Sequence, residues 1–124
     1  TVYFVTPSDL DDFPPVITAG PIVDSYSVTD TTALIGWFTD TASNSQIRYW
    51  AVGSTDTLDV FDSELTFGHF LILNHLSPNT TYRYIVRSTR TSNNLSASSE
   101  PEEFTTLLAG QVIELQFTRL PEIV

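Results

Sequence analysis

Short runs in which apolar and polar residues alternate recur along the chain, and turn residues separate them. A period of two places successive side chains on opposite faces of a strand, and no long stretch has the apolar spacing of three and four that a helix needs. The runs lie at residues 16–28 (broken at Gly20 and Pro21), 31–39, 46–52, 58–67, 70–76, 82–88 and 103–107. We expect residues 40–45 to form a polar turn and residues 90–100 a hairpin loop. Regular short strands of this kind predict an all-β fold, an antiparallel sandwich of two sheets.

Length and charge narrow the class of protein. A chain of 124 residues suits one domain and can bury a core without disulfides or metals. It contains no Cys, which excludes a disulfide framework and thiol catalysis. The formal net charge is −10 and all 5 cations are arginines, so nucleic acid and anionic lipid are poor partners. No apolar run reaches the length that spans a bilayer, and we expect no membrane insertion.

A tyrosine motif connects the pattern to a known family. Residues 76–82 read Leu-Ser-Pro-Asn-Thr-Thr-Tyr, which resembles the tyrosine corner of fibronectin type III domains. Trp37 resembles the core tryptophan of that family's second strand, Tyr49 its third-strand aromatic residue, and residues 103–106 its last strand. The resemblance covers about residues 14–108, and its nearest branch is the N-terminal domain of purple acid phosphatases, since Leu-Asn-His-Leu (73–76) precedes the corner.

The resemblance implies a scaffold, in the immunoglobulin-like class of sandwiches, without catalytic residues to carry over. It implies structural core roles for Trp37, Tyr49, Leu76, Pro78 and Tyr82. The tyrosine hydroxyl should bond to the backbone a few residues upstream, and Asn79 suits the turn because Asn tolerates a left-handed backbone.

Motifs that carry chemistry are missing from the sequence. It has no Gly-x-Ser-x-Gly elbow and no phosphate-binding glycine loop, so we expect no enzyme activity and no cofactor. We interpret the two histidines, His69 and His75, as surface or edge residues rather than metal ligands, and expect no metal site. Two acidic runs are interpreted as solvated loops: Asp9, Asp11 and Asp12 form the first, and Asp56, Asp59, Asp62 and Glu64 the second. Calcium binding by the first run is a lesser alternative. Asn79 and Asn94 begin glycosylation sequons, and Asn94 is the better candidate.

Two outward faces of the expected sheets carry candidate interfaces. The first is apolar and consists of Leu34, Phe38, Phe70 and Ile72, which either mark an interface or are covered by the chain's own extensions. The second combines cations with aromatic and apolar groups: Arg48, Trp50, Arg83, Ile85 and Arg87. Its arginines and Trp50 could form cation–π pairs that only stabilise the sheet, or the face could receive an acidic patch or a sugar ring.

Both ends of the chain alternate like strands. We divide the chain into an N-terminal extension (1–13, a candidate donor strand), the sandwich (14–108) and a C-terminal strand extension (109–124). The tail strands present Val2, Phe4, Ile113, Leu115 and Phe117. An apolar tail can add to a neighbour's sheet edge and so build a filament.

The leading hypothesis is a subunit of an extracellular fibre or cell-surface assembly, of the pilus or adhesion kind, that self-associates into a homopolymer or joins other protein subunits by strand complementation. The alternative is a spacer or carbohydrate-binding accessory module of a larger secreted enzyme.

Overall fold

The computed structural model describes residues 13–111, and every structural statement below refers to that part of the chain. It contains six strands and no helix: β1 Ile17–Val23, β2 Ala33–Ala51, β3 Leu58–Leu73, β4 Thr81–Thr89, β5 Ser96–Ser98 and β6 Glu102–Thr105. The predicted all-β, antiparallel class is confirmed. The expected additional strands at the two ends fall outside the described residues, so they stay predictions.

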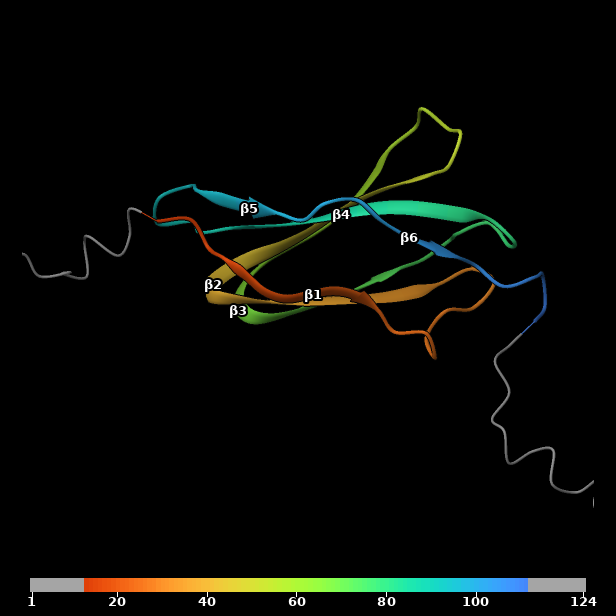
Figure 1. Ribbon diagram of the computed structural model, residues 1–124, viewed down its shortest axis with the longest axis horizontal. Coiled ribbons are helices and arrows are strands. Elements are labelled where there is room, and N and C mark those ends of the chain that lie inside the picture. Colours follow the sequence, from red (N-terminus) through yellow and green to blue (C-terminus); the bar gives the residue numbers. More distant parts are fainter. Residues whose placement is uncertain (1–12, 112–124) are drawn as a thin grey trace, which may run out of the picture.

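Two long strands connect the layers of the sandwich. The first half of β2 pairs with β1 and with residues 68–73 of β3, whereas its second half pairs with β4 and with residues 58–62 of β3. The strand β4 also pairs with β5 and β6. One hydrogen-bonded network therefore folds over into two layers (Figure 1). We call them the β1 layer (β1 and the adjoining halves of β2 and β3) and the β4 layer (β4, β5, β6 and the other halves).

The core lies between these layers and follows the predicted alternation. From β2, the residues Ile35, Trp37 and Ile47 are almost fully buried. Leu71 and Leu73 of β3, with Leu76 just after it, add to the core from the β1 layer, Tyr82, Tyr84 and Val86 add to it from β4, and Tyr49 and Phe104 complete the cluster. Apolar burial of this extent is the main term that stabilises such a sandwich.

The prediction of a polar turn at residues 40–45 is wrong. The strand β2 runs through this segment, with irregular register on either side of Ser43. The side chains of Thr39, Ser43 and Ser45 are buried, although their polarity suggested exposure. They tolerate burial because they have partners there: His69 lies 2.8 Å from Thr39 Oγ1 and 2.6 Å from Ser45 Oγ.

Two other strand boundaries also differ from the prediction. The runs expected at 58–67 and 70–76 form the single strand β3, which ends at Leu73. The loop expected at 90–100 contains the short strand β5. Glycine explains the first difference: Gly68 pairs with Phe38, and the ring of Phe38 lies over its backbone, so the ladder continues across it.

The tyrosine corner is confirmed in detail. The backbone N–H of Ser77 donates a hydrogen bond of 2.8 Å to the Tyr82 hydroxyl. Asn79 has a φ of 50°, in the left-handed region, and Leu76 is buried beside the turn. The ring of Tyr82 stacks on Phe104, with 5.7 Å between the centroids. The corner thus fixes the crossing from β3 to β4, on which the alignment of the β4 layer depends.

Candidate functional site

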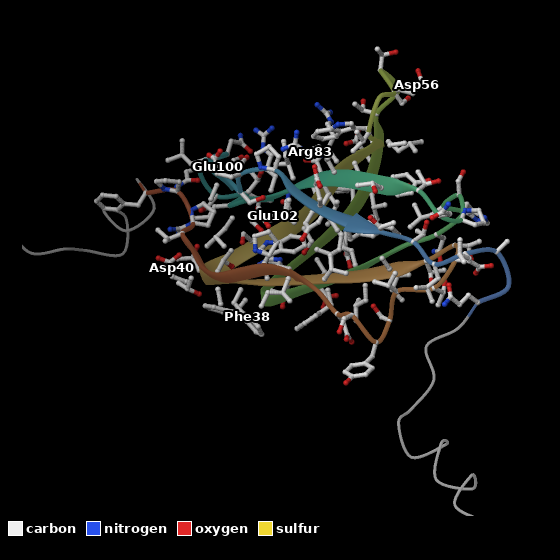
Figure 2. The ribbon with its side chains drawn as sticks, turned by 45° about the vertical axis from the view of Figure 1, so that its right-hand side comes forward. Phe38, Asp40, Asp56, Arg83, Glu100 and Glu102 are labelled. Carbon is white, nitrogen blue, oxygen red and sulfur yellow. The ribbon has the colours of Figure 1, made fainter. Side chains whose placement is uncertain are left out.

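An apolar surface occupies the outer side of the β1 layer. Leu34 lies opposite Ile72, and Phe38 and Phe70 sit on the same two strands facing the same way. The exposed fractions are 46% for Phe38, 57% for Phe70 and 54% for Ile72, so three large apolar side chains meet solvent together. Figure 2 shows Phe38 on this outer side, away from the β4 layer. The four residues are brought together, and whether they bind a partner stays a prediction.

The structure adds a residue from β1 to this surface. Ile22 pairs with Gly36 and is 64% exposed. The sequence pattern does not reveal Ile22 as part of this surface, because the break at Gly20 and Pro21 hides the alternation of that strand. We define the apolar face as Ile22, Leu34, Phe38, Phe70 and Ile72.

Glycines give the apolar face its hollow. Phe70 lies over Gly36 and Phe38 over Gly68, since a Cβ on either glycine would come within 2.8 Å or 3.0 Å of the facing ring. The two rings touch edge to face, with 5.7 Å between centroids. Between them and β1 remains a hollow of about 220 Å³, lined mainly by apolar groups. Large contiguous apolar patches are rare on monomeric proteins and usually mark a site of interaction.

Strand edges flank the apolar face on both sides. Among the described residues, β1 and β3 each pair with β2 alone, so each has one edge whose backbone groups meet no other strand. An edge of this kind is a template for pairing with another segment. Apolar surface and unpaired edge therefore occur side by side.

The second predicted face lies on the outside of the β4 layer. Arg48 is opposite Ile85, Trp50 is opposite Arg83, and Arg87 follows on β4. Figure 2 shows Arg83 on the side of the molecule opposite Phe38. Trp50 is only half-buried.

Two arginine–carboxylate ion pairs lie on this second face. Arg48 Nε lies 3.0 Å from Asp59 Oδ1, and Arg83 Nε lies 3.5 Å from Glu103 Oε2. The hydrogen bond that Arg48 donates to Asp59, together with the negative charge of that carboxylate, raises the pKa of Arg48. The ring contacts within residues 13–111 include no arginine on Trp50. Cation–π pairing, one of the alternatives considered for this face, is absent from the described residues, which show arginine–carboxylate pairing instead.

His69 corrects the interpretation of the histidines as surface or edge residues. Its side chain is fully buried and its ring stacks on Trp37, with centroids 5.0 Å apart and planes 7° from parallel. The Thr39 hydroxyl donates to the Thr41 carbonyl, so it accepts from His69 Nε2–H, and Nδ1 accepts from the Ser45 hydroxyl. Burial lowers the pKa of His69, which keeps the ring neutral.

A serine hydrogen-bonded to a histidine suggests a nucleophile and its base. Here Ser45 is 3% exposed and His69 is 0% exposed, so a substrate cannot reach either group. No carboxylate orients the ring; its other nitrogen faces Thr39. The pair is a buried structural network, completed by the hydrogen bond from Trp37 Nε1 to Ser88 Oγ at 2.8 Å.

The remaining candidates are scattered. His75, Asn79 and Asn94 are exposed and have left-handed backbones, and the structure does not test glycosylation. Asp56 lies at the tip of the β2–β3 hairpin (Figure 2), and Asp59 is engaged with Arg48. In residues 13–111 no three His, Asp or Glu side chains gather as metal ligands would, and no helix could cross a membrane. Two groups of candidate residues lie outside the described part of the chain: the first acidic run, with Asp9, Asp11 and Asp12, and the tail residues Val2, Phe4, Ile113, Leu115 and Phe117.

Comparisons with known proteins bear on the fold alone. No family model matches the chain, and no curated protein matches it. Among solved structures, a myokine has a TM-score of 0.63 at 18% identity, covering 76% of this chain and 96% of its own. The third fibronectin III domain of the human KIAA0343 protein has a TM-score of 0.60 at 18% identity, covering 84% and 91%. The chain has the fold of a fibronectin type III domain.

A third similar structure comes from bacteria. A sensor domain of the anti-sigma factor RsgI4 in Pseudobacteroides cellulosolvens has a TM-score of 0.52 at 20% identity, covering 77% of this chain and 97% of that domain. At identities of 18–20%, these three structures show the fold of the chain. The fibronectin type III fold hosts many functions, so the function has to be argued from the surfaces. The expected purple acid phosphatase branch finds no support in these structures.

Proposed function

We propose that this chain is a non-catalytic subunit of an extracellular fibre or cell-surface assembly, in which a terminal segment of one subunit adds as a strand to the next. The observation that carries the proposal is the apolar face beside the unpaired edges of β1 and β3. A strand added to either edge would gain backbone hydrogen bonds and lay alternate side chains on the apolar face. The tail residues Val2 and Phe4, or Ile113, Leu115 and Phe117, have the alternation that this requires.

The positions of the two ends of the described chain support a linear arrangement. The carbonyl of Phe13 accepts a 3.1 Å hydrogen bond from Asn93 Nδ2, near β5, whereas the amide of Gly110 donates one of 2.9 Å to Asp30 Oδ2, in the β1–β2 loop. These contacts lie at opposite ends of the sandwich (Figure 1). The two ends of the described chain thus lie at opposite poles, and contact with a neighbour through a segment that continues from either end would lead to a head-to-tail array.

The test is the assembly state of the full chain with and without the apolar face. Sedimentation velocity and electron microscopy of the wild type should show oligomers or fibres. Phe70→Ser should shift the protein to monomer because it removes an exposed ring from the middle of the apolar face. The matched control is Phe61→Ser: Phe61 is 58% exposed on the same strand, but it lies opposite Gln46 on the β4 layer. A monodisperse wild-type monomer at high concentration, or equal effects of both variants, contradicts the proposal.

Trp50 favours one alternative, a spacer or carbohydrate-binding accessory module of a larger secreted enzyme. Its ring is partly exposed beside Arg83, and sugar rings stack on such surfaces. A saccharide titration should then change the fluorescence of Trp50, while Trp37, which is buried, stays silent. No change in emission across neutral and acidic oligosaccharides would rule out the carbohydrate-binding version.

A further inference from the structure

A groove of about 250 Å³ crosses the outer side of the β4 layer, far from the apolar face. Arg87 of β4 lies in register with Gln46 of β2 on one side and Ser98 of β5 on the other. Residues directly opposite on neighbouring strands point to the same face, so the guanidinium lies between an amide and a hydroxyl. The groove is lined by Gln46, Arg48, Ile85, Arg87, Ser98 and Ser99.

The charge of Arg87 is not matched within the described residues. The neighbouring arginines on this face each have a carboxylate, Arg48 through Asp59 and Arg83 through Glu103. No Asp or Glu among residues 13–111 comes within ion-pair distance of Arg87, and Glu100, two residues beyond Ser98, does not reach it. Arg87 therefore keeps its five N–H donors for a ligand.

Other donors converge on the same groove. Ser99 Oγ accepts a 3.0 Å hydrogen bond from the Val86 amide, which leaves its O–H free to donate. In the described structure the side chains of Gln46 and Ser98 have no hydrogen-bond partner, although both could donate. Three strands thus present a cation and neutral donors, with no acidic group in the lining.

We propose that this groove binds the carboxylate of an aspartate or glutamate side chain in a partner protein. The Arg87 guanidinium pairs with the two carboxylate oxygens, while Gln46 and Ser98 donate from the sides. A single uncompensated cation on a chain of net charge −10 matches a monoanion better than a dianionic phosphate. The apolar side chain of Ile85, also in the lining, suits the methylenes of a glutamate.

The strand β5 points to a peptide as the source of the carboxylate. It pairs only with β4 in the described residues, so its other edge is available to an extended segment. A peptide residue paired there with Ser98 has its side chain on the same face as Arg87. A sugar acid has no peptide backbone and could not extend the ladder along that edge. The site is independent of the proposed assembly, because it lies on the opposite layer from the apolar face.

The test is a ¹⁵N NMR titration of the full chain with a capped pentapeptide that carries one central glutamate, at constant ionic strength. The Gln46 side-chain amide and the Ser98 and Ser99 backbone amides should shift saturably. Arg87→Gln should weaken binding at least about tenfold, the scale of a lost hydrogen bond to a charged group. The control Arg83→Gln, on the same face but paired with Glu103, should change the dissociation constant less than about twofold.

Three outcomes overturn the proposal. The first is equal binding of the matched peptide with glutamine in place of glutamate, which shows that the carboxylate is not read. The second is inorganic phosphate binding through Arg87 more tightly than the peptide. The third is Arg87-dependent binding of trigalacturonate without binding of the peptide, which assigns the groove to acidic sugars instead.

Discussion

At the scale of single residues, the buried ring of His69 makes the free energy of unfolding depend on pH in the mildly acidic range. Burial lowers its folded-state pKa below the usual value of about 6.5. Between those two pKa values the unfolded chain binds more protons than the folded chain, so the free energy of unfolding falls as the pH falls. The stability contributed by the neutral ring is complete above the unfolded pKa and is lost as the pH drops toward the folded one.

We predict that His69→Gln flattens this pH dependence. Urea midpoints measured between about pH 7.5 and pH 5, above the range in which most carboxylates titrate, should decline for the wild type and change less for the variant. His75→Gln, at the exposed histidine, is the control and should keep the wild-type slope. An NMR titration of the wild type, in which the His69 ring stays neutral as the pH falls through about 6.5, checks the same point. Equal slopes in H69Q and wild type would refute the explanation.

The tyrosine corner gives a second residue-scale prediction. Tyr82→Phe keeps the buried ring against Phe104 but removes the acceptor for the Ser77 amide. We expect the free energy of unfolding to fall by about 1 kcal/mol, the net value of one such hydrogen bond. Tyr26→Phe is the control because Tyr26 is 76% exposed. Denaturant unfolding measures both, and an unchanged midpoint for Y82F would show that the hydroxyl is not needed to hold the corner.

At the scale of elements, Gly20 determines how closely β1 lies against β2. Its φ is +84°, and a Cβ there would come 2.8 Å from the backbone oxygen of Gly36. Gly53 also has a positive φ, +90°, but a Cβ there meets nothing. We predict that Gly53→Ala costs about 1 kcal/mol for its left-handed backbone, and that Gly20→Ala costs clearly more because a backbone clash is added. Equal losses in thermal unfolding would mean that β1 can move away without penalty.

How far the sequence predicts these elements depends on what each strand buries. The alternation at Ile35, Trp37, Ile47 and Tyr49 predicts both halves of β2, since apolar residues take the inner positions. The join between the halves could not be predicted, because Thr39, Ser43 and Ser45 have the composition of a turn. Only the position of His69, some thirty residues further along the chain, makes their burial favourable.

The candidate surfaces follow the same logic. The resemblance to fibronectin type III domains implied that the strands at residues 31–39 and 70–76 share a sheet, and the strands at 46–52 and 82–88 were taken as neighbours, so both candidate faces could be assembled in advance. Ile22 and the arginine–carboxylate pairs could not, since they depend on how β1 bends and on where Asp59 and Glu103 lie across the sheet. The Arg87 groove depends on β5, which the sequence did not reveal as a strand.

At the scale of the whole molecule, net charge opposes the assembly that the apolar face favours. Each copy carries a formal charge of −10, so two copies repel at low ionic strength. We predict that raising the salt concentration from about 20 mM to about 300 mM strengthens self-association several-fold, because the Debye length falls from about 20 Å to about 6 Å while apolar contact is not weakened. Sedimentation velocity across this range measures the shift, and Phe70→Ser should stay monomeric at both ends. Association that weakens with added salt would instead indicate contact through opposite charges and would contradict an interface built on the apolar face.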